Sequence, residues 1–533
     1  MDFISTRIPY RQTNYFTKTA LDYIDQSEEL KPFFLHPPTI NGIQAAIAAR
    51  KNFSTNRRLL VEHLVKQYAD EAVDQKVYGN IESLLSENTF TVTTAHQPNI
   101  FLGPLYVIYK TLHVIRLADQ LNQSMPDHKF VPVFYMGTED ADLDELNHIF
   151  VEGEKLTWNT EQKGAVGRMK VDKGLLKIIA QQSGRLSVLP FGSEIISIVE
   201  KCYKVDLTLQ QATFQFLNSL FEEFGLVVLI ADSPLLKKQM NRIFEDDLMN
   251  QTASVIVQQT ADQLQQAGYK TQAHPRDVNL FYLRDNIRNR IIFENSKFAV
   301  ADTRIEFSKG EILKELEEFP DRFSPNVILR GLYQETILPN IAFVGGGGEL
   351  AYWLELKDLF LHYKVPYPLL LLRNSFLLTE KKCQEKIGKL GFTVEDFFLS
   401  EQNLMKKLVA KESKHELKLN GNMTAAENFY EMVKKQAVEV DITLGKHVEA
   451  LKIQMLRRLQ ELEKKMLKAE KRKFIDQQRQ IHTIKQSLFP SNSLQERFEN
   501  FMVYYAKWGR EFIQQLHEKS LALEQEFSIL IAK

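Results

Sequence analysis

The chain has 533 residues, more than a single hydrophobic core usually supports, so it should form at least two domains. Hydrophobic residues make up 44% and charged residues 25% of it, which is typical of soluble globular proteins and excludes a disordered or collagen-like chain. Lysine and arginine number 67 against 68 acidic residues, and the formal net charge of -1 offers no overall field to attract nucleic acid or an anionic membrane. We expect no nucleic-acid partner.

The cysteines and apolar runs indicate the compartment. Cys202 and Cys383, the two cysteines, form no C-x-x-C pair, so the sequence predicts neither a zinc site nor a redox motif. Scarce cysteine fits a reducing cytosol. The first residues lack the basic and apolar regions of a secretory signal, and no stretch approaches the roughly 20 apolar residues of a membrane span. We expect a cytoplasmic protein without a membrane partner.

Short apolar, β-branched runs recur through the first 375 residues, each followed by a polar loop and a segment of helical periodicity. This alternation is typical of βα units around a parallel sheet. The runs expected to be buried strands are residues 90–94, 130–136, 226–230, 341–344 and 367–372. We therefore predict an α/β core over residues 1–375.

From about residue 376 the sequence is rich in Lys, Glu, Gln and Leu and poor in Gly and Pro, which predicts a helical domain over 376–533. Apolar residues between 448 and 469 approach a heptad seam with one slip. The seam consists of Val448, Leu451, Met455, Leu459, Leu462, Met466 and Ala469. A long amphipathic helix lying on its own domain would show the same pattern. The charged flanks favour a coiled coil with another helix or subunit, and residues 493–533 are predicted to be further helix.

The polar residues after each strand are the candidates for a site, because ligands of open α/β sheets bind at the carboxyl ends of strands. Thr94, His96 and Gln97 follow the first predicted strand, and Pro104 is expected at the first position of a helix. The backbone N–H groups of such a helix start bind anions, so His96 could contact a phosphate. The same side chains could instead satisfy loop backbone groups. Spacing alone favours a solvated surface position for Lys110.

Carboxylates gather after the second predicted strand, at Glu139, Asp140 and Asp142, with His148 a few residues on. Such a cluster binds Mg²⁺ through one or two carboxylates together with substrate phosphates, or it holds an amine. It could equally favour the N-terminus of the following helix. His148 alone is typical of a capping or core histidine. No metal site made by the protein alone is predicted.

Four glycines at 345–348 follow the fourth predicted strand and indicate a tight turn or a close backbone approach to a ligand. They match neither the P-loop nor the dinucleotide-binding pattern. Glu349 and Trp353 begin the next helix, where they could line a pocket or pack in the core. Arg330 lies near an apolar segment, and isolated arginines are usually structural.

Together these segments resemble the BshC family of bacillithiol biosynthesis, along nearly the whole chain. The resemblance is far more specific than any one motif. It is carried by Thr94-Ala95-His96-Gln97, Phe101-Leu102-Gly103-Pro104-Leu105-Tyr106 with Tyr109-Lys110, Val131-Pro132-Val133-Phe134, Thr138-Glu139-Asp140-Ala141-Asp142 with Asn147-His148, Ser324-Pro325-Asn326-Val327 with Arg330, Leu338-Pro339, Gly345-Gly346-Gly347-Gly348-Glu349-Leu350-Ala351-Tyr352-Trp353, Arg373-Asn374-Ser375, Leu488-Phe489-Pro490 and Leu494-Gln495-Glu496-Arg497.

The resemblance implies a Rossmann-like core related to class I nucleotidyltransferases, with inserted connecting segments, and a C-terminal coiled coil that forms a homodimer. It implies a ligase that adds L-cysteine to the amine of glucosaminyl-malate, with ATP or another activating nucleotide, together with Mg²⁺, activating the carboxylate at the loop 94–103. In this scheme His96 and Gln97 steady the phosphate or carboxyl group, and Glu139, Asp140 and Asp142 bind the amine or Mg²⁺. The expected binding residues are Thr94, Gly103, Pro104, Lys110, His148, Arg330, Gly346, Gly347, Glu349 and Trp353.

Two other functions share these features. A synthetase-like nucleotidyltransferase that charges a nucleic-acid acceptor would use the same core, but it needs a basic face, which the neutral charge balance argues against. A non-catalytic, nucleotide-binding coiled-coil scaffold would keep the fold without turnover. Intact polar loops at three strand ends argue against the scaffold.

Overall fold

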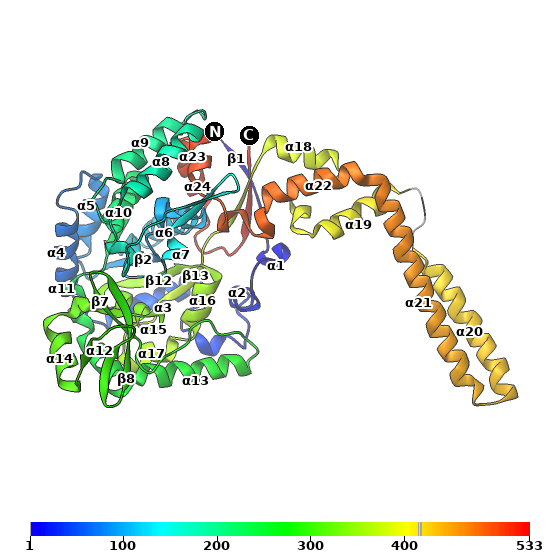
Figure 1. The fold of residues 1–533 in the computed structure, drawn as a ribbon, viewed down its shortest axis with the longest axis horizontal. Helices are drawn as coiled ribbons and strands as arrows, with labels where there is room; N and C mark the ends of the chain where they lie inside the picture. The colour runs from blue at the N-terminus through cyan, green and yellow to red at the C-terminus, as the bar shows by residue number, and fades with distance from the viewer. Residues whose placement is uncertain (1, 414, 416–417) are drawn as a thin grey trace. The chain divides into compact units, whose positions relative to one another are not determined.

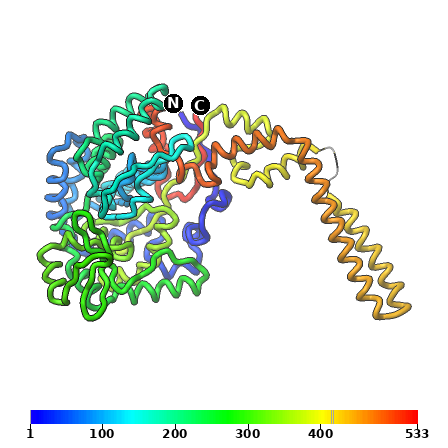
Figure 2. Tube along the Cα trace, in the orientation of Figure 1, coloured from blue at the N-terminus to red at the C-terminus, as the bar shows by residue number. Residues whose placement is uncertain are grey.

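The computed structural model describes residues 2–413, 415 and 418–533. The chain divides into two compact units, one formed by Met1–Leu378 with Ser493–Lys533 and the other by Thr379–Asn492. The compact helical unit is therefore shorter than the domain predicted over 376–533, because residues 493–533 fold with the first unit. Figure 2 traces the whole chain from the N-terminus to the C-terminus.

The five predicted strands form one parallel sheet with the order β13-β12-β2-β3-β6, which confirms the predicted α/β core. Its strands are β2 (Thr89–His96), β3 (Lys129–Met136), β6 (Val227–Ile230), β12 (Asn340–Gly345) and β13 (Leu369–Leu372). The chain builds outward from β2 to β6 and then returns to the other side of β2. The strand order therefore reverses between β2 and β12, as in Rossmann-like folds, and ligands bind at such a reversal.

Helices cover the sheet and make its strands buried throughout. α6 (Tyr106–Ser124) packs on β2 and β3, and α3 (Ile40–Lys51) packs on β12 and β13. The other α-helices before the helical unit are α1 (Tyr10–Thr13), α2 (Lys18–Ile24), α4 (Arg57–Gln67), α5 (Gln75–Ser83), α7 (Leu143–Leu146), α8 (Lys173–Leu186), α9 (Gly192–Cys202), α10 (Leu209–Phe221), α11 (Pro234–Lys237), α12 (Asn241–Asn250), α13 (Thr252–Gln266), α14 (Lys309–Glu318), α15 (Val327–Ile337), α16 (Gly347–Leu354) and α17 (Lys357–Tyr363).

Two β-structures are inserted between strands of the parallel sheet. A hairpin of β4 (His148–Val151) and β5 (Glu154–Thr157) follows β3. A second sheet, of order β10-β9-β8-β7-β11, lies between β6 and β12 in the sequence. Its strands are β7 (Leu280–Arg284), β8 (Ile287–Glu294), β9 (Lys297–Val300), β10 (Glu306–Phe307) and β11 (Phe323–Pro325).

Residues Ser493–Lys533 fold with the first unit. They contain α23 (Met502–Trp508) and α24 (Arg510–Lys519), as predicted, but residues 527–532 are not helical. They form β15 (Phe527–Ala532), which pairs antiparallel with β1 (Phe3–Ile8) in a sheet that also holds β14 (Phe376–Glu380), so the two chain termini lie side by side in Figure 1. The prediction of helix was wrong here because a short, fully buried apolar run is a strand signal that helical neighbours obscured.

The second unit is helical, with α18 (Lys381–Lys389), α19 (Glu401–Glu412), α20 (Asn420–Val440), α21 (Leu444–Lys471) and α22 (Ile475–Leu488). α20 and α21 lie side by side as a hairpin (Figure 1), joined by ion pairs such as Lys434 to Glu449 at 2.7 Å. The predicted seam lies on α21, where Val448 is buried but Leu451, Met455 and Leu462 remain 40%, 41% and 47% exposed. No described helix is long and apolar enough to cross a membrane.

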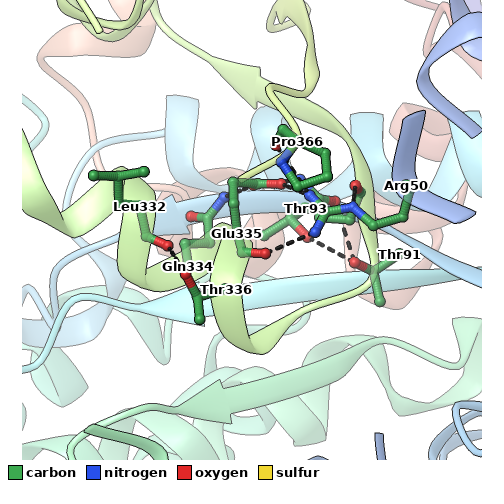
Figure 3. Close-up of polar contacts among 9 residues, drawn as sticks. Arg50, Thr91, Thr93, Leu332, Gln334, Glu335, Thr336 and Pro366 are labelled. Atoms are coloured by element: carbon green, nitrogen blue, oxygen red, sulfur yellow. Dashed lines mark hydrogen bonds and ion pairs between the residues drawn. The ribbon is translucent and has the colours of Figure 1, made fainter. Parts of the chain in front are cut away.

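A buried polar network ties α3 and α15 to the amino ends of β12 and β13 (Figure 3). Arg50 forms an ion pair with Glu335 at 2.6 Å and donates to the backbone oxygens of Glu335, Asn340 and Pro366. The Asn340 side chain donates to Glu335 and accepts from the hydroxyls of Thr91 and Thr93. Both charges are buried and paired. The network therefore stabilises the amino ends of the strands, whereas the site lies at their carboxyl ends.

Candidate active site

A cavity of about 410 Å³, here called the main cavity, opens at the carboxyl ends of the parallel strands where the strand order reverses. Loops after all five strands contribute to it, and β8 and α15 complete it. The polar residues that line it are His96, Gln97, Tyr106, Tyr135, Thr138, Glu139, Asp140, Glu145, Asp232, Arg288, Asn326, Arg330, Glu349, Tyr352, Arg373 and Arg497. The sequence analysis placed the site at these strand ends, and the structure brings the loops together there.

His96 is the last residue of β2 and faces the main cavity. Its Nε2 is buried and has no hydrogen-bond partner among the described residues. Burial lowers the pKa of His96 well below its ordinary value, and the nearby charges of Lys110 and Arg373 add to this shift. His96 is therefore neutral at pH 7, and its free ring nitrogen can donate to or accept from a ligand.

Glu139 follows β3 and belongs to a buried chain of alternating charges. Lys237 of α11, whose side chain is 0% exposed, forms an ion pair with Glu139 and lies 3.4 Å from Asp232. Arg168 donates to both carboxylate oxygens of Asp232, at 2.6 and 2.7 Å. Burial raises the pKa of Glu139, while Lys237 acts in the opposite direction. The Glu139 carboxylate therefore lines the cavity, and Lys237 balances its charge.

Asp140 is more weakly paired than its neighbour Glu139. It accepts a hydrogen bond from Gln97 Nε2 at 3.1 Å, and the nearest guanidinium nitrogen of Arg288 lies 4.0 Å away. Asp142, the third predicted carboxylate, is exposed and does not line the cavity, because the chain turns away into α7. Within the described part of the chain, no group of three or more His, Cys, Asp or Glu side chains is arranged to hold a metal ion.

Lys110 is buried, contrary to the expectation of a solvated surface lysine, because its face of α6 packs against the sheet. Its Nζ donates to Ala95 O at 2.6 Å and to Glu349 Oε2 at 2.9 Å. The same Glu349 oxygen accepts from the N–H of Gly346 at 2.8 Å. The Glu349 carboxylate therefore occupies the N-terminus of α16, the position where a helix would otherwise bind an anion.

Arg330, Arg373 and Arg497 supply positive charge to the main cavity. Arg330 donates to the hydroxyl of Tyr352 at 2.7 Å. Arg373 forms a 2.8 Å ion pair with the buried Glu496, and its guanidinium lies 4.9 Å from the ring centroid of Tyr106. Guanidinium groups in such a cavity bind carboxylates or phosphates.

Six predicted binding residues do not line the main cavity: Lys110, described above, His148, described below, and Thr94, Gly103, Pro104 and Trp353. The Thr94 hydroxyl donates to Val344 O at 2.8 Å and so joins β2 to β12. Trp353 is fully buried against Phe343 and Phe360, so it packs in the core. Gly103 has a φ of 62° at the turn before α6, which favours glycine. Pro104 is not at the first helical position, because α6 begins two residues later and Pro104 pairs with Asn500.

A second cavity of about 320 Å³, here called the side cavity, adjoins the main one. The two share His96, Gln97, Tyr106, Glu145 and Arg497. The rest of its lining consists of the predicted residues Pro104 and His148 together with Asn99, Leu146, Ile149, Phe150 and Phe498. Burial lowers the pKa of His148. The predicted residues are thus distributed over two connected compartments.

The sequence analysis missed Arg168, Asp232, Lys237, Arg288, Arg373 and Arg497 as site residues. Arg373 directly follows the fifth predicted strand, which was a usable signal. Asp232 likewise follows the third strand closely. Lys237 and Lys238 are adjacent in a short helix and have the pattern of surface lysines, and Arg288 lies in an inserted sheet. Their positions depend on tertiary structure that no local pattern reveals.

The fold and the site define a Rossmann-like α/β protein with a charged, two-compartment cavity at the reversal of its sheet, followed by a helical unit. The family model described as "Bacillithiol biosynthesis BshC, N-terminal Rossmann-like domain" matches residues 3–374. The model described as "Bacillithiol biosynthesis BshC, C-terminal coiled-coil domain" matches residues 376–532. The chain belongs to the BshC family of bacillithiol biosynthesis, which confirms the resemblance seen in the sequence.

Curated relatives match over almost their whole length. A protein of Flavobacterium johnsoniae named "Putative cysteine ligase BshC" is 39% identical over 525 residues, 98% of this chain and 99% of the relative. Proteins with the same name from Flavobacterium psychrophilum and Cytophaga hutchinsonii are each 38% identical, covering 98% and 97% of this chain and the same shares of the relatives.

Proposed function

We propose that this chain is a ligase that joins L-cysteine to the amine of glucosaminyl-malate and so forms the amide bond of bacillithiol. The observation that carries the proposal is the main cavity, in which a neutral histidine, a weakly paired carboxylate and several arginines meet at the sheet reversal. Membership of the BshC family supports the pathway. A cytoplasmic location is proposed as well, and the scarcity of cysteine in the chain supports it.

The cavity contains groups suited to each part of the reaction. Amide formation needs an activated carboxyl carbon, an unprotonated amine and an acceptor for the proton that the amine loses. Asp140 is assigned to the amine, because it is more weakly paired than Glu139, and the Glu139 carboxylate, which Lys237 keeps charged, is assigned to accept the proton. His96 and Gln97 are assigned to the carboxyl group under attack, where a free ring nitrogen and an amide can contact its oxygens.

ATP is proposed as the activator, and when bound it supplies a leaving group for the carboxylate. Arg330 and Arg373 would hold its phosphates, because their guanidinium donors suit phosphate oxygens. The N-terminus of α16 is less suited, since the Glu349 carboxylate fills it. Mg²⁺ would depend mainly on the phosphates, because Glu139 is paired and Asp142 lies outside the cavity.

A homodimer through the α20–α21 hairpin is also proposed. The half-exposed seam residues Leu451, Met455 and Leu462 lie on α21 and are not fully covered by α20. A second copy of the hairpin would cover them, and apolar residues at heptad spacing are suited to such packing.

The reaction is tested with the purified full chain, isotopically labelled L-cysteine, glucosaminyl-malate and Mg-ATP. Thiols are alkylated and bacillithiol is quantified by mass spectrometry. We expect labelled bacillithiol from the wild type and at least about 100-fold less from Asp140→Asn, while Asp142→Asn, a matched change outside the cavity, retains activity. Equal product without nucleotide would reject ATP. No product from the folded wild type with any nucleoside triphosphate would reject the reaction.

A further inference from the structure

Two side chains of opposite charge line the side cavity and have no direct ion-pair partner in the described part of the chain. Glu145 and Arg497 line it at its border with the main cavity, and both are solvent-accessible, so a ligand can reach them. Within the described residues, Glu145 and Arg497 form no ion pair with each other, and neither forms one with a third residue. Burial lowers the pKa of Arg497, and the like charge of Arg373 adds to this shift, while the Glu496 carboxylate acts in the opposite direction. A ligand that carries one positive and one negative group would compensate both side chains.

A buried acceptor in the same cavity also lacks a partner. Asn99 is 6% exposed, and its Nδ2 donates to Glu145 O at 3.3 Å, whereas its Oδ1 has no hydrogen-bond partner among the described residues. Buried polar atoms are nearly always paired, and Asn99 is among the residues that line the side cavity, so its orphan oxygen is a candidate acceptor for a donor from outside the chain. An ammonium group is such a donor, and it also suits the nearby Glu145 carboxylate.

Apart from His96, Gln97 and His148, the remaining wall is apolar and aromatic. The rings of Phe150 and Phe498 are stacked with centroids 4.1 Å apart, and Ile149 and Leu146 extend this surface. Phe150 is held in place by β4, and Asn500 donates its N–H to Phe150 O at 2.9 Å. Sulfur makes favourable contacts with aromatic rings, so the wall suits a small thiol side chain better than a charged one.

We propose that the side cavity is the binding site of the amino-acid substrate, and that it takes L-cysteine as a zwitterion. This assignment rests on the proposed function for the identity of the amino acid. The ammonium group binds Glu145 and Asn99 Oδ1, the carboxylate binds Arg497, and the thiol lies against Phe150 and Phe498. Since Arg497 and His96 line both cavities, the carboxylate is placed at their border, where the main cavity can present the amine.

The opposite placement, with glucosaminyl-malate in the side cavity and L-cysteine in the main cavity, fits the charges less well. Glucosaminyl-malate carries two carboxylates and needs more than one cation. The side cavity has Arg497 as its arginine, whereas the main cavity adds Arg288 to the Arg330 and Arg373 that are assigned to the phosphates. The larger compartment, with its additional arginines, is therefore the one that suits the larger and more anionic substrate.

The test combines ligands that each lack one charge with variants that each lack one charge. Binding to the full chain is measured by calorimetry under reducing conditions, with and without glucosaminyl-malate. The ligands are L-cysteine, cysteamine, which lacks the carboxylate, and 3-mercaptopropionate, which lacks the ammonium group. The variants are Glu145→Gln and Arg497→Gln, with Asp144→Asn as the matched control, since Asp144 is exposed and lines neither cavity.

We expect Glu145→Gln to weaken L-cysteine binding about tenfold or more and to leave 3-mercaptopropionate within about twofold. Arg497→Gln should weaken L-cysteine and 3-mercaptopropionate to a similar degree and leave cysteamine within about twofold. Asp144→Asn should change none of the three. This crossed pattern assigns each charge of the ligand to one side chain, which a general loss of structure cannot imitate.

Two results overturn the assignment: variants that weaken all three ligands equally or not at all, and a wild type that binds no L-cysteine with or without glucosaminyl-malate. The outcome is separable from that of the proposed function. If the wild type makes bacillithiol while both variants keep its KM for L-cysteine within about twofold, the function stands and the side cavity is misassigned. If the crossed pattern appears but no bacillithiol forms, the amino-acid site stands and the reaction is wrong.

Discussion

Buried polar groups lie at both ends of the central strands, but the two networks are completed differently. At the amino ends, Arg50 and Glu335 are paired and further bonded to backbone and side-chain groups (Figure 3). At the carboxyl ends, His96 Nε2 and Asn99 Oδ1 lack partners among the described residues. The first network is complete within the protein and serves stability. The second leaves positions for a ligand, at some cost to stability.

The largest effect is expected at the amino ends. Arg50→Met leaves Glu335 buried without its counter-ion and removes donors from three backbone oxygens. We expect the free energy of unfolding to fall by about 3–5 kcal/mol, measured by urea denaturation. Arg58→Met removes an exposed pair with Glu62 and should cost less than about 0.5 kcal/mol. Equal losses in the two variants would contradict the contrast between the buried network and the surface.

The next effect concerns catalysis at the carboxyl ends. Lys237→Met removes the cation beside Glu139, so the pKa of Glu139 should rise and its carboxylate should form only at higher pH. We expect bacillithiol formation at pH 7 to fall about 100-fold, with the acid limb of the pH–rate profile displaced upward and Lys237→Arg retaining more activity. Other charges near Glu139 are Asp232, Arg168 and Arg288, and they remain.

Lys238→Met is the control for this change, because Lys238 is 54% exposed and pairs with Glu317 at 2.7 Å on the surface. It should leave the rate and the pH profile unchanged. A profile of the Lys237 variant that keeps its wild-type shape, with only a lower plateau, would show that Lys237 supports the fold and does not set the ionisation of Glu139.

A smaller effect is expected from His113, which is buried on α6. His113 bonds to Ala522 O at 2.7 Å and accepts from the N–H of Asn374, and burial lowers its pKa to about 4. Because the unfolded chain binds this proton near pH 6.5, its contribution to stability is complete above that pH and is lost as the pH falls toward 4. We expect a loss of about 2 kcal/mol between pH 7 and pH 5 from this group.

Urea denaturation at the two pH values measures this loss. The change with pH should be smaller in His113→Gln and unaltered in His482→Gln, since His482 is 59% exposed. His96, whose pKa is also lowered by burial, adds in the same direction. The same pH dependence in all three proteins would show that His113 titrates normally.

The smallest effect concerns the helical unit. Met455→Lys places a charge on the exposed seam of α21 and should weaken dimerisation about tenfold or more, measured by sedimentation equilibrium. Gln454→Lys adds the same charge to a neighbouring exposed position off the seam and should leave the dissociation constant within about twofold. A wild type that stays monomeric at high concentration would reject the proposed homodimer.

The sequence could predict the parallel sheet because its buried strands are short apolar runs, and the strand-end rule then located His96, Gln97, Glu139 and Asp140. It could not predict partners supplied by distant segments. Lys237 has the pattern of a surface lysine until α11 packs behind Glu139, and Trp353 suits a pocket as well as a core until Phe343 and Phe360 enclose it. The side cavity depends on Arg497 and Phe498, which return from the far end of the chain.

The most direct test deletes the gene in its source organism and quantifies bacillithiol and glucosaminyl-malate by alkylating thiols and mass spectrometry. Complementation uses the wild type, Glu139→Ala/Asp140→Ala and the control Asp142→Asn, at matched protein levels. We expect deletion to abolish bacillithiol and to accumulate glucosaminyl-malate, and we expect the wild type and the control to restore the thiol while the cavity variant does not. Unchanged bacillithiol after deletion, in an organism that makes it and holds no second copy of the gene, would contradict the account.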